Sequence, residues 1–310
     1  MTLEQLRIFV AVAEREHVTR AAHYLRLTQS ATSAAIAALE ARYATKLFNR
    51  IGRRIELTPA GRVFLAEARA VLARAAAAET ILADVAGLRR GSLTLAASQT
   101  VGNYWLPPLM HRYRAAYPGI AVNLTIGNTE TVAAKVRDGA ADLGFVEAAV
   151  TDPLLSLTPV AEDELVLVTS AGRKPAKKRS QTPADLKGLR WVFREQGSGT
   201  RTIFEAAMSG LGVDVSELDV VLELPSNEAV RAAVLDGAGA ALLSKLVVAV
   251  PLKAGTLVAL NIALPKRQFF ALRHKERYVT QAEREFYAVM ESRPGRPRGA
   301  HPLHTRSQRS

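Results

Sequence analysis

The stretch that decides the fold is Thr19-Arg-Ala-Ala-His-Tyr-Leu-Arg-Leu-Thr-Gln-Ser-Ala-Thr-Ser33. Residues 19–25 have helical spacing, residues 26–28 form a sharp break, and a second helix is expected over residues 29–42. Ala21 and Ala22 offer no bulk, so another helix can cross them closely. An earlier helix is expected over residues 2–14, which begins with a capping box. These patterns predict a helix-turn-helix.

The helix expected over residues 29–42 has one apolar face and one face of short polar side chains. Thr28 is placed to cap it. Side chains of this kind meet base edges and phosphates when a recognition helix lies in the major groove. The candidate DNA-contacting residues of this helix are Thr28, Gln29, Ser30, Thr32 and Ser33.

Residues 46–50 and 54–58 alternate like the two strands of a hairpin, which would form a wing beside the helix-turn-helix. Arg50, Arg53 and Arg54 lie at or next to its tip, where guanidinium groups can hold phosphates or enter a narrow minor groove. The alternative is a small helical domain with a solvated basic hairpin. The polar helix face together with the arginine tip favours double-stranded DNA as the partner.

Several motifs in fixed order carry a family resemblance. They are Met1-Thr-Leu-Glu-Gln-Leu-Arg-Ile-Phe9, Thr19-Arg-Ala-Ala22, Leu27-Thr-Gln-Ser-Ala-Thr-Ser33 with Ala38-Leu-Glu40, Leu47-Phe-Asn-Arg50 and Leu57-Thr-Pro-Ala-Gly61. With them the chain closely resembles the LysR-type transcriptional regulators, in register through about Met290. The resemblance implies a homodimer or homotetramer that binds DNA and works with RNA polymerase.

One departure from the family concerns Ala34-Ala35, where a long polar or basic side chain is usual. Base reading by the recognition helix is then limited to its first turns. We therefore expect a larger share of the affinity to come from phosphate contacts and from the wing.

The composition excludes several classes of protein. Hydrophobic residues at 48% and charged residues at 23% are typical of a globular chain. No apolar run reaches the roughly 18 residues of a membrane span. Glu4 and Arg7 interrupt the first apolar stretch, where a signal peptide would have its apolar core. Because the chain has no cysteine, we expect a cytoplasmic protein without disulfides, metal or cofactor.

The net charge of +12 is concentrated at the two ends of the chain. Residues 1–90 carry 14 Lys and Arg against 8 Asp and Glu, residues 91–290 carry 22 against 20, and residues 291–310 carry 5 against 1. A basic N-terminal domain fits a polyanionic partner whose binding weakens with salt. Residues 291–310 lack apolar periodicity, and we interpret them as a disordered basic tail rather than an auxiliary nucleic-acid contact.

A long helix is expected from Pro59 to about Val85. Heptad spacing along it defines a seam of Phe64, Ala68, Val71, Ala75, Ala78, Leu82 and Val85. The seam could pack on its own domain, but its alanine-rich surface and the dimerising linker helix of the family favour contact with a second copy. The predicted units are thus a winged helix-turn-helix over residues 1–58 and a linker over residues 59–90.

From residue 91 the pattern alternates between strands and helices, as in parallel α/β sheets. The predicted fold class is α/β, with an all-α winged helix-turn-helix joined by a linker helix to two Rossmann-like lobes of periplasmic-binding-protein type. The resemblance to the family implies that the final helix belongs to the first lobe. The chain then passes between the lobes twice, near Val160 and near Lys266. The effector-binding domain, residues 91–290, then divides into lobe I (91–160 and 267–290) and lobe II (161–266).

In such lobes ligands lie beyond the carboxyl ends of the strands, where helix N-termini present free N–H groups. That rule selects polar and glycine-rich segments as effector-binding candidates: Ser98, Gln99, Thr100, Asn128, Thr129, Glu147, Ser198, Gly199, Thr200, Arg201 and Asn227. For any single residue, capping its own helix is an equally good account. Their convergence on one cleft favours a small anionic effector, to which Arg201 would add charge.

The segments Ala97-Ser-Gln-Thr-Val-Gly-Asn-Tyr-Trp-Leu-Pro107, Gly127-Asn-Thr-Glu130, Gly144-Phe-Val-Glu147 and Glu195-Gln-Gly-Ser-Gly-Thr-Arg201 resemble one branch of the family. It contains CysL-like regulators of sulfur assimilation and CbbR-like regulators of carbon fixation. The resemblance implies a small sulfur oxyanion, which we favour, or a phosphorylated or nucleotide metabolite.

The sequence does not favour an enzyme. It has no cysteine nucleophile, no Gly-x-Ser-x-Gly elbow and no dinucleotide fingerprint. Glu147 and Glu195 could serve as acid and base, but single carboxylates near a cleft are more often capping or salt-bridge partners. A solute-binding protein for transport would explain the cleft but not residues 1–90.

Overall fold

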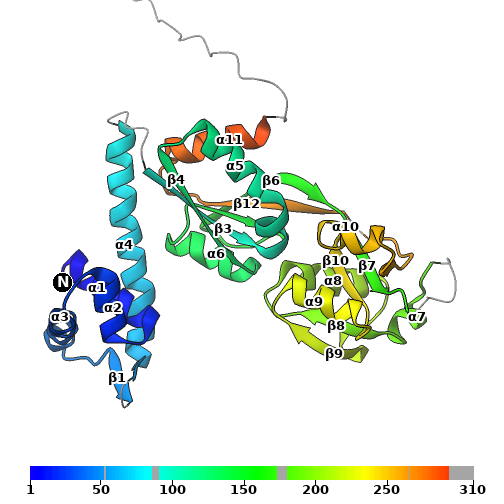
Figure 1. The fold of residues 1–310 in the computed structure, drawn as a ribbon, viewed down its shortest axis with the longest axis horizontal. Helices are drawn as coiled ribbons and strands as arrows, with labels where there is room; N and C mark the ends of the chain where they lie inside the picture. The colour runs from blue at the N-terminus through cyan, green and yellow to red at the C-terminus, as the bar shows by residue number, and fades with distance from the viewer. Residues whose placement is uncertain (52–53, 86–90, 173–179, 265, 293–310) are drawn as a thin grey trace, which may run out of the picture.

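The computed structural model describes residues 1–51, 54–85, 91–172, 180–264 and 266–292. It consists of an N-terminal helical domain with a hairpin, one long helix and two α/β lobes (Figure 1). The predicted fold class is confirmed. The end of the expected linker, residues 86–90, and most of the expected basic tail, residues 293–310, lie outside the described residues. Among the described helices, none is long and apolar enough to cross a membrane.

The N-terminal domain contains α1 (Leu3–Arg15), α2 (Val18–Leu25) and α3 (Gln29–Arg42), followed by the antiparallel strands β1 (Phe48–Ile51) and β2 (Arg54–Leu57). Ala21 and Ala22 are 0% and 3% exposed, so α2 packs closely against its neighbours. Phe9 at the centre contacts the ring of Phe48 from the hairpin, with centroids 5.3 Å apart. The hairpin is thereby fixed to the helical core.

The long helix α4 (Pro59–Val85) begins inside this domain and leads to lobe I (Figure 1). The Phe64 ring lies 4.8 Å from the Phe9 ring, and Ala68 is 1% exposed. Val71 and Leu82, farther along the predicted seam, are 41% and 71% exposed. The start of the seam therefore packs on its own domain, contrary to expectation, while later positions remain on the surface. The side chain of Val85 lies outside the described part.

Lobe I has a five-stranded sheet in the order β4-β3-β5-β12-β6. Its strands are β3 (Gly91–Ser98), β4 (Ile120–Gly127), β5 (Leu143–Val146), β6 (Leu155–Asp163) and β12 (Arg267–His274). Its helices are η1 (Val101–Trp105), α5 (Leu106–Ala116), α6 (Thr129–Asp138) and α11 (Gln281–Glu291). Buried Tyr113 and Phe286, with rings 5.3 Å apart, join α5 to α11 on one face, and α6 covers the other (Figure 1).

Lobe II contains the antiparallel strands β10-β7-β11 and the parallel pair β8-β9. Its strands are β7 (Leu165–Ser170), β8 (Arg190–Arg194), β9 (Asp219–Leu224), β10 (Ala241–Ser244) and β11 (Leu257–Ala259). Its helices are α7 (Pro183–Lys187), α8 (Gly199–Gly210), η2 (Val215–Glu217), α9 (Asn227–Leu235) and α10 (Lys245–Lys253). Trp191, Phe193 and Phe204 stack at its core.

The two lobes are joined by β6 and β12, which lie side by side and run antiparallel (Figure 1). The sequence located both crossings but neither strand. Because β12 enters between β5 and β6 and runs antiparallel to both, the sheet of lobe I is mixed rather than parallel. This arrangement places Arg267 directly opposite Asp163 at the point where the chain changes lobe.

Candidate functional site

The first candidate site is the recognition face of α3, which we define as Thr28, Gln29, Ser30 and Ser33. The first three are exposed and Ser33 is half-buried. Their polar groups hydrogen-bond among themselves, with 3.1 Å from Gln29 Nε2 to Ser33 Oγ and 3.1 Å between the Thr28 and Ser30 hydroxyls. Such side chains can turn outward to base edges without leaving a buried group unpaired.

Thr32 does not belong to this face. It is 0% exposed, and its hydroxyl donates to the carbonyl oxygen of Thr28 at 3.0 Å. The expectation that Thr32 contacts DNA is therefore replaced by a structural role, since the residue packs toward the helical core and steadies the first turn of α3.

The wing is anchored to α3 by Glu40, which sequence reasoning missed. Its carboxylate accepts the N–H groups of Leu47 and Phe48 at 2.8 and 3.2 Å and lies 2.8 Å from Lys46 Nζ. Burial raises the pKa of Glu40, but these hydrogen bonds and the Lys46 charge bring it below its usual value. Glu40 thus holds the wing at a fixed place beside the recognition helix.

Of the predicted wing-tip arginines, Arg53 lies outside the described residues. Arg50 and Arg54 fall in β1 and β2, and their side chains also lie outside the description. Their contact with DNA stays a prediction.

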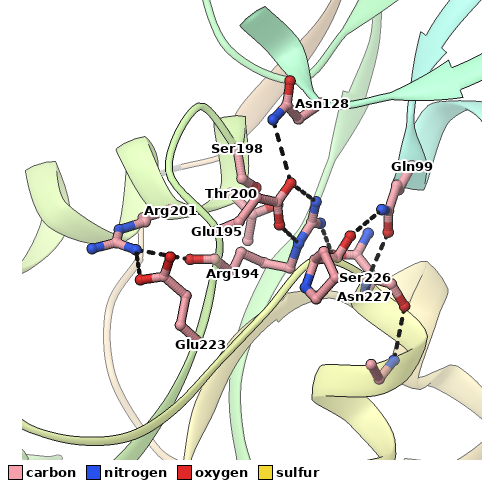
Figure 2. Close-up of polar contacts among 12 residues, drawn as sticks. Gln99, Asn128, Arg194, Glu195, Ser198, Thr200, Arg201, Glu223, Ser226 and Asn227 are labelled. Carbon is pink, nitrogen blue, oxygen red and sulfur yellow. Dashed lines mark hydrogen bonds and ion pairs between the residues drawn. The ribbon is translucent and has the colours of Figure 1, made fainter. Parts of the chain in front are cut away.

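The second candidate site is the interlobe junction, which we define as the carboxyl ends of β3, β4, β5, β8 and β9 with the helix starts that follow them. Gln99 spans it, because its Oε1 accepts the N–H of Asn227 at 2.8 Å and its Nε2 donates to Pro225 O at 2.6 Å (Figure 2). Asn227 Nδ2 donates to Thr100 Oγ1 at 3.0 Å, and Thr100 N donates to Glu147 Oε1 at 3.0 Å. The two lobes therefore touch through predicted site residues.

Arg267 lies at the centre of the junction, and no local sequence signal predicts it. Its side chain is 2% exposed, and its Nε is 2.5 Å from Asp163 Oδ2. One terminal nitrogen donates to Thr200 Oγ1 of lobe II at 3.1 Å, and the other lies 3.4 Å from Thr100 Oγ1 of lobe I. A single guanidinium at the chain crossing thus contacts both lobes.

A second buried arginine, Arg194, ends β8. It forms hydrogen bonds of 2.7 and 2.8 Å with both oxygens of Glu195, and Asn128 Nδ2 reaches that carboxylate from lobe I at 3.5 Å (Figure 2). Burial raises the pKa of Glu195, but Arg194 and Asn128 bring it below the usual value. The rule that selected strand ends could have found Arg194.

Three predicted residues, Ser98, Thr129 and Ser198, are buried with hydroxyls that have no hydrogen-bond partner. They are 1%, 8% and 1% exposed. Asn128 caps α6, whereas Ser198, at the same position before α8, makes no capping bond. Helix capping therefore accounts for Asn128 but not for Ser198. A buried polar group left unpaired costs about 1–3 kcal/mol, so these hydroxyls point to a bound partner.

Close packing surrounds these hydroxyls. A Cβ atom on Gly199 would lie 2.7 Å from Thr129 Oγ1 and 3.3 Å from the backbone nitrogen of Ala148. Only glycine lets the start of α8 approach lobe I this closely. The site therefore suits a small ligand.

Arg201 does not contribute its charge to the junction, contrary to expectation. Its guanidinium is 2.8 Å from Glu205 Oε1 and 2.5 Å from Glu223 Oε2, and it also donates to the backbone carbonyl oxygen of Arg194 at 3.0 Å (Figure 2). Acidic side chains on the outer side of lobe II neutralise it. The buried cations of the junction are Arg194 and Arg267 instead.

The buried charges at the junction do not sum to a positive site. Arg194 and Arg267 contact three carboxylates, those of Glu147, Asp163 and Glu195. Within the described ranges no group of three or more His, Asp or Glu could hold a metal ion. The junction can therefore hold a ligand through neutral hydroxyl and backbone donors rather than through net charge.

Both parts of the chain match family models. Residues 3–62 match the model described as "Bacterial regulatory helix-turn-helix protein, lysR family". Residues 86–294 match the LysR substrate binding domain. The first match ends in the first turn of α4 and the second begins just after α4, so most of this helix lies between the two matches.

Curated relatives extend over nearly the whole chain. The regulator YeiE of Escherichia coli K12 is 34% identical over 288 residues, which cover 92% of this chain and 96% of YeiE. CysL of Bacillus subtilis is 31% identical, covering 90% and 91%. CbbR of Rhodospirillum rubrum is 34% identical, covering 84% and 85%.

Solved structures share the fold. Full-length CbnR in complex with its target DNA superposes with a TM-score of 0.69 at 23% identity, covering 94% of this chain and 99% of CbnR. The regulatory domain of CcmR from Synechocystis PCC6803, in complex with 2-PG, gives a TM-score of 0.60 at 27% identity, covering 65% of this chain and 96% of that domain.

Proposed function

Because the chain belongs to the LysR family of DNA-binding transcriptional regulators, we propose that its interlobe junction binds a small oxyanion and thereby changes promoter binding. The family is one of regulators rather than enzymes. The observation that carries the proposal is the set of three buried, unpartnered hydroxyls on Ser98, Thr129 and Ser198. They come from both lobes, so one ligand could bridge them.

The chemistry of the junction favours an anion that needs donors only. The acceptors nearby are engaged, since Glu147 receives the Thr100 N–H and Glu195 is held by Arg194. The groups without partners are hydroxyls, which can donate. An oxyanion without a proton, such as sulfate or sulfite, fits this arrangement. We therefore favour a sulfur oxyanion.

The alternative effector is a phosphorylated metabolite of carbon assimilation, whose phosphate would occupy the same hydroxyls. The 2-PG complex of CcmR and the relationship to CbbR favour this second candidate. The close packing at Gly199 disfavours nucleotides in this conformation. We also propose a cytoplasmic homodimer or homotetramer that acts with RNA polymerase.

Regulation requires that the effector bind one lobe arrangement better than another, because a ligand with equal affinity for both shifts nothing. Arg267 provides the link, since it contacts Thr100 in one lobe and Thr200 in the other. An anion that draws these hydroxyls or reorients the guanidinium would change the angle between the lobes.

The test is a thermal-stability titration of the full-length protein with sulfate, sulfite, thiosulfate, 2-phosphoglycolate, ribulose bisphosphate and NADPH. We expect one of the sulfur oxyanions to raise the unfolding midpoint most. In both Ser98→Ala and Ser198→Ala, the anion concentration needed for the same rise should be at least tenfold higher. Ser209→Ala, on the exposed end of α8, is the matched control. A larger shift with 2-phosphoglycolate selects the alternative, and shifts unchanged in both variants exclude the junction.

A further inference from the structure

A cavity lies away from the junction, between the linker helix α4 and lobe I. We call it the linker cavity, and its volume is about 160 Å³. Its walls include Arg74 and Thr80 of α4, and Asp142, Arg277 and Glu283 of lobe I. A cavity of about 150 Å³ accommodates a ligand the size of benzene, so this one has room for about six non-hydrogen atoms.

The linker helix is seated directly on lobe I beside this cavity. Asp84 Oδ2 of α4 accepts the N–H of Gln281, the first residue of α11, at 2.7 Å. At the other end, a Cβ atom on Gly139 would lie 2.9 Å from the Ala73 Cβ of α4. The linker cavity is therefore enclosed partly by the helix that carries the DNA-binding domain.

One wall of the linker cavity is acidic and incompletely paired. Glu283 is 4% exposed; its Oε1 accepts from Thr280, but its Oε2 has no hydrogen-bond partner. Asp142 accepts the N–H of Thr94 at 2.7 Å. Burial raises the pKa of both carboxyl groups, that of Glu283 to about 7, with Asp142 adding repulsion at Glu283. A buried acceptor without a donor calls for a ligand that donates hydrogen bonds.

A second part of the lining is basic. Arg277 donates to the carbonyl oxygens of Val136 and Arg137, both at 3.0 Å, and its charge is opposed by Arg74 and partly balanced by Asp142, Asp138 and Glu283. Arg74 is exposed on α4 and makes no hydrogen bond or ion pair with another described residue. The nearby cations and burial lower the pKa of His274, which favours its neutral form.

These two parts of the lining exclude ligands of a single charge. A simple amine would meet the repulsion of Arg74, Arg273 and Arg277, and a simple carboxylate would meet that of Asp142 and Glu283. We propose that the linker cavity binds a small zwitterion of the amino-acid class. Its ammonium group donates to Glu283 Oε2 and Asp142, and its carboxylate pairs with Arg74.

Because Arg74 belongs to α4 and Glu283 to α11, the bound zwitterion connects the linker helix to lobe I. Occupancy would fix the direction in which α4 carries the DNA-binding domain. This input is separate from the interlobe junction, and both could act on the same DNA complex.

The test is isothermal titration of the full-length protein with glycine, L-alanine and L-serine, compared with propylamine and propionate as single-charge probes. We expect at least one amino acid to bind in the millimolar range and neither single-charge probe to bind at the same concentrations. Glu283→Gln and Arg74→Gln should each weaken the amino acid at least tenfold. Glu291→Gln and Arg62→Gln, on the same two helices but outside the cavity, should leave it unchanged.

The proposal is overturned if none of the three amino acids binds, if propylamine or propionate binds equally well, or if affinity is unaffected in both cavity variants. Ser98→Ala separates this site from the interlobe junction, since it should weaken the anion response and retain amino-acid binding. Loss of amino-acid binding in Ser98→Ala would place the ligand at the junction and contradict a second site.

Discussion

Single residues at the junction act mainly as buried polar groups whose partners are supplied by another part of the chain. Arg267 is the strongest case, with its guanidinium between Asp163 and Glu147 and 2% of its side chain exposed. No neighbour in sequence indicates this environment, because the partners are Glu147, just after β5, and Asp163, at the end of β6. Sequence motifs therefore do not predict the role of Arg267, although it makes the central ion pairs of the junction.

We predict that Arg267→Met destabilises the protein by about 3–5 kcal/mol, because it leaves two buried carboxylates without their cation. Urea unfolding of the variant and the wild type measures the difference. Arg201→Met is the control, since its acidic partners are about half exposed and can be solvated. Equal losses in the two variants would show that Arg267 has no special burial cost.

Glu283 makes stability depend on pH. Its folded pKa of about 7 lies above the ordinary 4.5, so the folded state binds more protons than the unfolded chain between these values. The free energy of unfolding contributed by this residue is therefore highest below pH 4.5 and falls as pH rises to about 7.

We predict that Glu283→Gln, which keeps a side-chain acceptor for Thr280, is more stable than the wild type at pH 8 by on the order of 2–3 kcal/mol and equal to it near pH 4. Chemical unfolding at both pH values measures this. A wild type at least as stable as the variant at pH 8 would show that burial does not penalise this carboxylate.

At the scale of elements, the local signals were sufficient for the helices. The capping residues Thr2, Thr28 and Thr280 mark starts that the structure retains, and α4 begins and ends at the expected residues. Each of these signals lies within a few residues of the feature it specifies. That is why they can be read from sequence.

The strands β6 and β12 were missed because their pairing is non-local. Their partners in the sheet are far apart in the chain, and the sequence of β6 includes Pro159 and charged residues that weaken a strand pattern. For the site, strand ends located Ser98, Thr129 and Ser198. The rule failed for Arg201, where Glu205 one turn later was the available signal of a helix-surface ion pair.

Two polar residues of the recognition helix, Gln29 and Thr32, have different expected roles that the sequence alone does not distinguish. Gln29→Ala should cost about 1–3 kcal/mol at one cognate base pair while leaving the salt dependence of binding unchanged. Thr32→Val should instead lower the stability of the N-terminal domain and leave base preference intact, because its hydroxyl is buried against Thr28. Binding to a panel of single-base operator variants decides the matter, and altered base preference only in the Thr32 variant would reverse these roles.

At the scale of the whole molecule, the basic N-terminal domain and the two-lobed domain are connected by one helix, α4. α4 is packed into the N-terminal domain at Phe64 and Ala68 and held to lobe I at Asp84. A change in the angle between the lobes therefore has a direct mechanical route to the DNA-binding surface. The exposed Val71 and Leu82 leave part of the seam for a second copy.

The most direct test of the central claim is DNase footprinting of the full-length protein on genomic fragments selected by its own binding, with and without the oxyanion that stabilises it. The account predicts that the anion changes the footprint of the wild type, and that a Ser98→Ala/Ser198→Ala double variant keeps the basal footprint and loses the change. An identical anion response in both proteins, or no binding to DNA at low ionic strength, would contradict it.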